Sequence, residues 1–332
     1  MKPRSKTPAG EANNVVLMAA LSSAEHIVRD GREPRRVLTD IHLRIDKAQS
    51  WGITARTGFE VRLLLEIMGN IRPYDGGKCV LVQRGMMRRK RVILPHVFYI
   101  GDADMLYGNM NVLEYLMFAT AHLRDDRLSM QEELFEFLVA IGLGSISLSV
   151  IRWLTAEERA TVALVAAAYS DCAMTVFNLP ESVFDERLRR AITATAQLIT
   201  RRGKTLVIGT MDGALIGQAC SHTAFVADGR ILYQGGTEHL RHEYDKVSVI
   251  IEDADIGDIK QRLAPVLSGC ALVEKEGRLL VKTNDATASP ESLYRAMLEA
   301  GIVPRCMRVN EKTVDNAYEE LMQQHDLSEQ LF

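Results

Sequence analysis

The sequence lacks the features that mark membrane-spanning, secreted and nucleic-acid-binding proteins. No stretch of its 332 residues approaches the roughly 18–20 consecutive apolar residues that a membrane-spanning helix needs. The N-terminal residues carry charges with no apolar segment behind them, so we expect no secretory signal peptide. A formal net charge of only −3 gives no electrostatic reason to expect nucleic acid as a partner.

Cysteine pairs are also missing from the sequence. The cysteines are Cys79, Cys172, Cys220, Cys270 and Cys306, and they stand far apart. No two of them form a CxxC pair, and none stands with histidine at the spacing of a zinc site. We therefore expect free thiols, as in a reducing compartment, and no bound metal.

What the sequence does contain is the composition of a folded globular protein. Hydrophobic residues make up 47% and charged residues 25% of the chain. A chain of this length is expected to form two domains, or one domain with a sizeable appendage. Residues 1–14 are polar and are predicted to be a disordered tail.

After this tail, apolar strands alternate with turns and helices. The strands are predicted at 37–45, 50–55, 173–177 and 205–210. The helix predicted at 155–169 has Thr155 at its N-cap position, with Glu157 and Glu158 in its first turn. This alternation predicts an α/β core.

The pattern changes near residue 246. From there the predicted order is β-α-β-β-α-β, with the last strand at 302–309, followed by a helix at 313–323. We therefore place a domain boundary near Tyr244, between a first domain at 15–244 and a compact α+β accessory domain at 245–332.

The order of motifs in the first domain is its most informative feature. Residues 51–69 have the outline of a phosphate-binding loop between a strand and a helix. Residues 154–158 lead without a gap to Pro180 and Asp185, in the register of an LSGGQ signature followed by Asp-Glu-Pro and Leu-Asp. With further matches at 37–41, 73–77, 106–116 and 227–235, the chain resembles the nucleotide-binding (ATPase) subunit of an ABC transporter.

This resemblance implies an α/β fold with a P-loop (RecA-like) ABC ATPase core. Antiparallel β and α-helical subdomains would belong to that core, with the helical subdomain at about 103–154. The C-terminal α+β (β-α-β-β-α-β) domain resembles an appendage that some of these subunits carry.

The loop lacks the side chains that hold phosphate. A working loop, G-x-x-x-x-G-K-[ST], supplies a lysine for the phosphate oxygens and a hydroxyl for Mg²⁺. If Gly58 is its last glycine, these positions hold Phe59 and Glu60. Aligned on Gly69, they hold Glu60 and Val61. Phe59 and Glu60 thus put bulk and negative charge where phosphates would enter.

Two arginines leave an alternative open. Arg56 or Arg62 would replace the lysine as the contact for an anion, although the glycine cradle around them is incomplete.

Other positions that the resemblance assigns to catalysis have changed as well. Asn178 and Leu179 stand for the Mg²⁺-ordering aspartate and the general-base glutamate, and leucine can neither accept a proton nor orient a water molecule. Met211 replaces the histidine that senses the γ-phosphate. The glutamine that links Mg²⁺ to the membrane subunit corresponds to Asp102, or to Gly101 with a shift of one residue.

The signature is altered too. In this family it holds the phosphate bound to the partner subunit, and here it reads Leu154, Thr155, Ala156, Glu157 and Glu158. The threonine keeps a hydroxyl, but the two glutamates bring negative charge towards a phosphate. The alternative interpretation is simply an acidic helix N-terminus.

Because these groups are lost together, we expect a catalytically inactive subunit, not an enzyme, that acts as a structural and allosteric partner in a transporter. No cofactor is predicted, and weak ATP binding stays open. The other candidates are a stand-alone cytosolic scaffold or regulator derived from an ABC ATPase, and a weak nucleotide-sensing pseudo-ATPase.

The resemblance also implies partners and a location. The partners would be a membrane-spanning transporter subunit and a second nucleotide-binding subunit, an active homologue, on the cytoplasmic face of the membrane. Candidate residues for docking on the membrane subunit are Met105, Leu106 and Met110.

Overall fold

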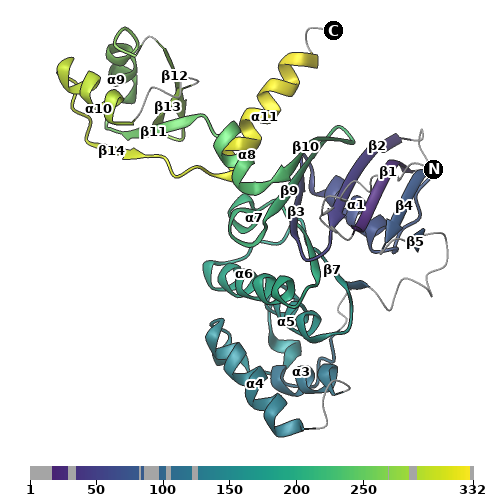
Figure 1. Cartoon of the computed structure of the whole chain (residues 1–332). Helices are drawn as coiled ribbons and strands as arrows, with labels where there is room; N and C mark the ends of the chain where they lie inside the picture. Colours follow the sequence, from purple (N-terminus) through teal and green to yellow (C-terminus); the bar gives the residue numbers. More distant parts are fainter. Residues whose placement is uncertain are drawn as a thin grey trace, which may run out of the picture.

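The structure is a computed structural model that describes residues 17–28, 35–81, 84–85, 97–101, 106–121, 126–267, 269–283 and 290–329. The tail predicted at 1–14 lies outside these residues. Figure 1 shows a central sheet with a small antiparallel sheet beside it, a group of helices below it and the accessory domain above. None of the described helices has the length and apolar character needed to cross a membrane.

The central sheet has the strand order β10-β9-β3-β8-β7-β6. Its strands are β3 (Ser50–Ala55), β6 (Val97–Ile100), β7 (Met174–Asn178), β8 (Thr205–Gly209), β9 (His222–Ala227) and β10 (Arg230–Gly236). All of the pairings are parallel except that of β10 with β9. Every residue of β3, β7 and β8 is buried, as expected for parallel strands covered on both faces. The predicted α/β core is confirmed.

Each face of this sheet has its own hydrophobic core. On one face, α1 (Gly58–Met68) and the small antiparallel sheet pack around side chains such as Ile53 and Val207. Leu206 and Ile208, which alternate with Val207 along β8, belong to the core of the other face. The helices there are α5 (Ala156–Tyr169), α6 (Glu186–Arg201) and α7 (Gly213–Ala219).

The small antiparallel sheet has the strand order β2-β1-β4-β5. Its strands are β1 (Leu17–Val28), β2 (Arg35–Asp46), β4 (Gly76–Leu81) and β5 (Arg84–Gly85). Buried and exposed residues alternate along the second half of β2, so one face of this sheet packs on α1 and the other is solvated.

Helices occupy the range in which a helical subdomain was predicted. α3 (Val112–Thr120) and α4 (Arg127–Ala140) are followed by short 3₁₀ turns at Gly144–Ile146 and Ile151–Trp153. Asn111 caps α3 through a capping box with Glu114, which fixes where this helix begins.

The accessory domain has the predicted order β-α-β-β-α-β. Its elements are β11 (Val247–Glu252), α9 (Ile256–Leu263), β12 (Cys270–Lys275), β13 (Arg278–Thr283), α10 (Pro290–Glu299) and β14 (Cys306–Val309), with the strands in the order β12-β13-β11-β14. The prediction of a strand at 302–309 was wrong for residues 302–305, because β14 begins at Cys306. Gly301 has a φ of +69° and ends α10, and the Ile302 N–H donates to the Met297 carbonyl at 2.9 Å, so this segment is a helix cap.

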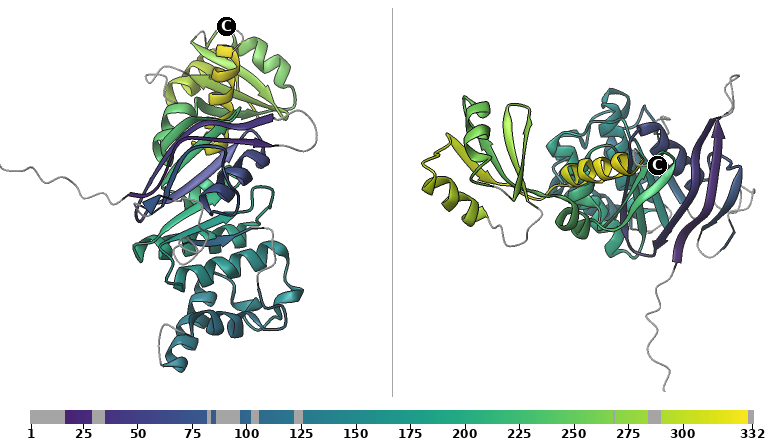
Figure 2. Two further views of the ribbon diagram at one scale, coloured as in Figure 1. Left: turned by 90° about the vertical axis from the view of Figure 1, so that its right-hand side faces the viewer. Right: turned by 90° about the horizontal axis from the view of Figure 1, so that it is seen from above.

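The last helix, α11 (Val314–Glu329), is longer than the predicted 313–323 and leaves the accessory domain. It packs beside α7 and α8 (Thr237–Tyr244), and the Tyr318 ring stacks on Phe225 of β9 with centroids 4.6 Å apart. Its apolar residues Val314, Ala317 and Leu321 belong to the core of the central sheet. Figure 2 shows α11 extending from the accessory domain across to the central sheet.

All five cysteines are free thiols. Burial raises the pKa of the Cys79 thiol to about 12 and also raises that of Cys220, whereas Cys306 is exposed. The described residues contain no group of three or more His, Cys, Asp or Glu side chains arranged to hold a metal ion.

Candidate nucleotide site

The loop at the carboxyl end of β3 caps its own helix. Thr57 is the N-cap of α1, and its hydroxyl accepts the Glu60 N–H at 3.4 Å. The Glu60 carboxylate accepts the Thr57 N–H at 3.3 Å and the Thr57 hydroxyl at 3.0 Å. Its other oxygen accepts the Gly229 N–H at 3.0 Å. Donors at this helix start are thus bonded to a carboxylate of the same chain.

Phe59 and Glu60 therefore differ in where their side chains lie. The expectation that both stand where phosphates would enter was wrong for Glu60, which is only 7% exposed because its carboxylate bonds inward to Thr57 and Gly229. Phe59 is 46% exposed at the start of α1, and Val61 is fully buried. The Phe59 ring thus remains at the surface of the loop, whereas the Glu60 carboxylate lies beneath that surface.

The two candidate cations are both engaged by acids. The Arg56 guanidinium contacts Asp326 of α11 at 2.5 Å and Asp228 at 3.5 Å. Arg62 on α1 contacts Glu181 at 3.1 Å. Each guanidinium therefore already has a carboxylate where a phosphate oxygen would bind.

At the end of β7, Asn178 and Leu179 are both buried. The Asn178 amide donates to the Arg62 carbonyl at 3.0 Å and to the Tyr99 hydroxyl at 2.8 Å, which ties β7 to α1 and β6. The Leu179 N–H donates to the Gly209 carbonyl at 3.3 Å. Both residues thus serve to pack the strand ends together.

Met211 and Asp185 are two further positions that the resemblance assigns to the nucleotide site. In the structure each makes contacts that stabilise the fold. The Met211 sulfur accepts the Thr54 hydroxyl at 3.8 Å, and its N–H donates to the Pro180 carbonyl at 3.1 Å. Asp185 is the N-cap of α6, where its carboxylate accepts the Leu188 N–H at 2.7 Å. Gly58 lies beside Glu181 and Pro180, so the loop, the end of β7 and Met211 adjoin one another.

The altered signature also forms a capping box, like the starts of α1 and α3. The Thr155 hydroxyl accepts the Glu158 N–H at 3.2 Å, and the Glu158 carboxylate accepts the Thr155 N–H at 3.0 Å. Glu158 also pairs with Arg187 of α6 at 2.6 Å. Leu154 is buried, Thr155 and Ala156 are exposed, and Glu157 is half-buried. These bonds match the interpretation of the segment as an acidic helix N-terminus.

The predicted docking region is only partly described. Met105, like the site position Asp102, lies outside the described residues. Leu106 and Met110 are half-buried against the core. The sequence reasoning missed their neighbours Tyr107 and Phe118, whose rings form an edge-to-face pair 5.1 Å apart and are 56% and 53% exposed.

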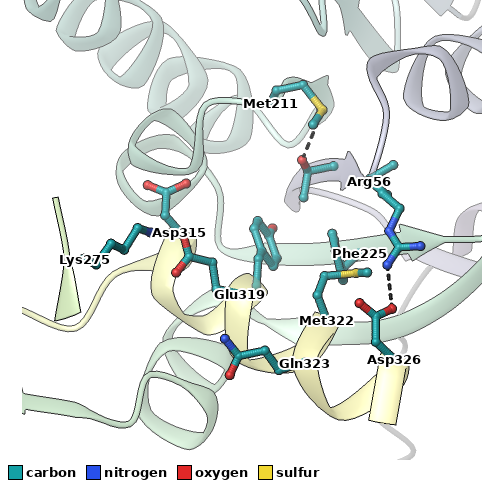
Figure 3. Close-up of a pocket in the computed structure, with 12 residues that line it drawn as sticks. Arg56, Met211, Phe225, Lys275, Asp315, Glu319, Met322, Gln323 and Asp326 are labelled. Atoms are coloured by element: carbon teal, nitrogen blue, oxygen red, sulfur yellow. Dashed lines mark hydrogen bonds and ion pairs between the residues drawn. The ribbon is translucent and has the colours of Figure 1, made fainter. Parts of the chain in front are cut away.

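A pocket of about 620 Å³ lies between α11 and the end of β3. Figure 3 shows Arg56 and Met211, from the domain that contains the central sheet, on one side of this pocket, with Met322 and Asp326 of α11 opposite them. The sequence reasoning missed this contact between the end of the chain and the loop.

Several known proteins are similar in sequence to this chain. An ABC transporter ATP-binding protein of Listeria monocytogenes is 21% identical over 229 residues, covering 67% of this chain and 85% of that protein. The methionine import ATP-binding protein MetN of Wolinella succinogenes is 24% identical over 209 residues, covering 61% of this chain and 69% of MetN. No known family profile matches the chain.

Among solved structures, the ATP-binding cassette MJ0796, in a dimeric post-hydrolysis state bound to ADP and Pi, matches with a TM-score of 0.55. The match has 14% sequence identity and covers 66% of this chain and 99% of the cassette. It confirms the cassette-type α/β fold that the sequence predicted.

Proposed function

Since the chain belongs to the ATP-binding cassette family of ABC transporters, we propose that it is a cassette subunit that does not hydrolyse ATP and serves as a structural and allosteric partner. The observation that carries this proposal is the state of the loop. The Glu60 carboxylate accepts the N–H and the hydroxyl of Thr57 at the start of α1, and carboxylates pair with both Arg56 and Arg62. The cap residue and the two candidate cations of the loop are thus engaged within the chain.

The residues described here do not fit a Mg²⁺–nucleotide. The loop has no lysine, and its acid, Glu60, is committed to the helix cap. The Asn178 amide nitrogen donates to Arg62 and Tyr99, and its buried Oδ1 accepts no hydrogen bond from the described residues but is a neutral oxygen where the family has a carboxylate. The buried Leu179 side chain can neither bind a cation nor take a proton. Catalysis of phosphoryl transfer rests on positioning and charge stabilisation, and these side chains supply neither.

Outside the loop, the domain keeps the buried strands and the capped helices of a stable fold. The buried strands β3, β7 and β8 and the capping boxes of α1, α3 and α5 are those of a well-packed domain. A folded cassette without catalytic groups still offers surfaces to a membrane-spanning subunit and to a second cassette. We place the protein in such a complex, peripheral on the cytoplasmic face of the membrane, with an active homologue as the second cassette.

The first test is hydrolysis. The purified chain with ATP and Mg²⁺ is expected to release phosphate at the background rate, because Leu179 stands in the general-base position and the loop has no lysine for the γ-phosphate. Steady-state phosphate release measures this. Mg²⁺-dependent turnover of about 1 per second that Arg62→Ala abolishes would contradict the proposal.

The second test concerns docking. Tyr107→Asp with Phe118→Asp is expected to reduce the membrane-bound fraction of the protein about tenfold, because exposed aromatic pairs of this kind are typical interface anchors. Sedimentation with membranes from cells that contain the partner subunit measures it. Leu128→Asp, on α4 at a side chain that is 79% exposed, is the matched control and should sediment like the parent. Equal sedimentation of the double variant and the control would exclude this docking surface.

A further inference from the structure

Helix α11 connects the accessory domain to the loop. Near its middle, Glu319 pairs with Lys275 of β12, and Glu320 pairs with Lys282 of β13 at 3.1 Å. On the cassette side, the Tyr318 hydroxyl lies 2.8 Å from the Thr223 hydroxyl, and its ring stacks on Phe225. The first half of α11 is therefore held by both domains.

The end of α11 is held differently. Asp326 contacts Arg56 at 2.5 Å across the pocket of about 620 Å³, and both side chains are nearly half exposed, at 47% and 41%. Met322 lines the same pocket from α11. Figure 3 shows Asp326 of α11 paired with Arg56, and both residues line the pocket, which follows α11 from Asp315 to Asp326. An exposed ion pair is a weak and reversible contact.

We propose that α11 is a strap whose Asp326 stands in for a bound anion at Arg56, so that the loop can hold a phosphate-type anion only when the end of α11 moves away. This inference rests on the proposed function, because it concerns a loop that is proposed to lack catalysis and that keeps Arg56 beside its helix start. A guanidinium binds carboxylate and phosphate oxygens with the same fork of donors, so the two compete for Arg56.

The strap would make anion binding depend on the accessory domain. Lys275 and Lys282 fix the middle of α11 to the accessory sheet, so a movement of that sheet is transmitted to the end of the helix. The apparent affinity for an anion rises with the fraction of molecules in which Arg56 is released. Asp228, 3.5 Å from Arg56, remains beside the guanidinium after Asp326 leaves, so an anion must also compete with this second carboxylate.

The test uses four variants of the full chain and inorganic pyrophosphate as the probe. Asp326→Ala frees Arg56, and Asp326→Ala with Arg56→Ala removes the site itself. Arg56→Asp with Asp326→Arg restores the ion pair but leaves no cation on the loop. Glu311→Ala, at an exposed residue before α11, has the same charge change as Asp326→Ala and is the matched control.

In Asp326→Ala, hydrogen–deuterium exchange over residues 322–329 and pyrophosphate affinity at low salt are both expected to rise about fivefold. The control should match the parent in both measurements. The charge-reversed pair should exchange like the parent and bind no pyrophosphate, and the double alanine variant should exchange quickly without binding.

Unchanged exchange in Asp326→Ala would show that the pair does not hold the helix end, and faster exchange without tighter binding would show that Arg56 is no anion site. Either result overturns the strap. Neither depends on turnover, so the strap and the proposed lack of hydrolysis can fail separately.

Discussion

A chain carrying Glu60→Lys together with Val61→Ser is expected to lose most of its stability and to gain no ATPase activity. The pair restores a lysine and a hydroxyl in one alignment of the loop. However, the Glu60 carboxylate accepts three hydrogen bonds, two from Thr57 and one from the Gly229 N–H. An ammonium group accepts none, so the change would leave these donors unsatisfied and place a cation beside them.

The expected cost is large compared with the stability of a domain. Losing the capping box costs about 1–2 kcal/mol, and a buried charge without a partner costs about 3–5 kcal/mol. Val61 is fully buried, so a serine there adds about 1–3 kcal/mol. Even with overlap between these terms, about 5 kcal/mol is lost from a typical total of about 5–15 kcal/mol.

Urea unfolding followed by circular dichroism measures this loss. Glu60→Gln keeps one acceptor and should lose only about 1–2 kcal/mol. Glu132→Lys, at an exposed residue of α4, makes the same change of charge and should stay within about 0.5 kcal/mol of the parent. If the double variant unfolds at the same urea concentration as the parent and binds ATP, then Glu60 does not stabilise the loop and only blocks the nucleotide site.

Local rules explain most of what the sequence predicted correctly. Helix α5 begins at its predicted cap, Thr155. The hairpin between β9 and β10 also follows a local rule, since it turns at Asp228 and Gly229, which both have positive φ. These features depend on residues a few positions apart. The same holds for the helices and strands of the accessory domain up to α10.

One local signal was present but was interpreted differently. Thr57 and Glu60 have the spacing of a capping box, and the structure uses them as one. The comparison with a phosphate loop led instead to the expectation that Glu60 faces the phosphate space.

Contacts between distant parts of the chain could not be predicted in this way. Arg56 and Asp326 are 270 residues apart, and no periodicity relates them. The spacing of Val314, Ala317 and Leu321 predicts that α11 has an apolar face. It does not say whether the accessory sheet or the central sheet covers that face, because both offer apolar side chains.

Asp245→Ala is expected to release the start of α11 and the accessory domain while the central sheet stays folded. The carboxylate is completely buried between α8 and β11. One oxygen accepts the Val247 N–H at 3.0 Å. The other accepts the Thr313 N–H at 2.7 Å and the side-chain amides of Asn310 and Asn316 at 3.0 and 3.1 Å. The chain passes between the two domains twice, at 245–247 and at 310–316, and this single side chain joins the two crossings.

Removing it takes the acceptor from one buried and three part-buried donors, which costs about 3–5 kcal/mol. Because all of these donors lie at the crossings, the loss should appear as faster hydrogen–deuterium exchange over 310–321 and as proteolysis near 245–247, with β3, β7 and β8 still protected. Asp255→Ala is the control. It removes the exposed cap of α9, should cost about 1 kcal/mol, and should leave α11 protected. Equal exchange over 310–321 in the two variants would mean that the stacking of Tyr318 and the packing of Leu321, and not Asp245, hold α11 on the central sheet.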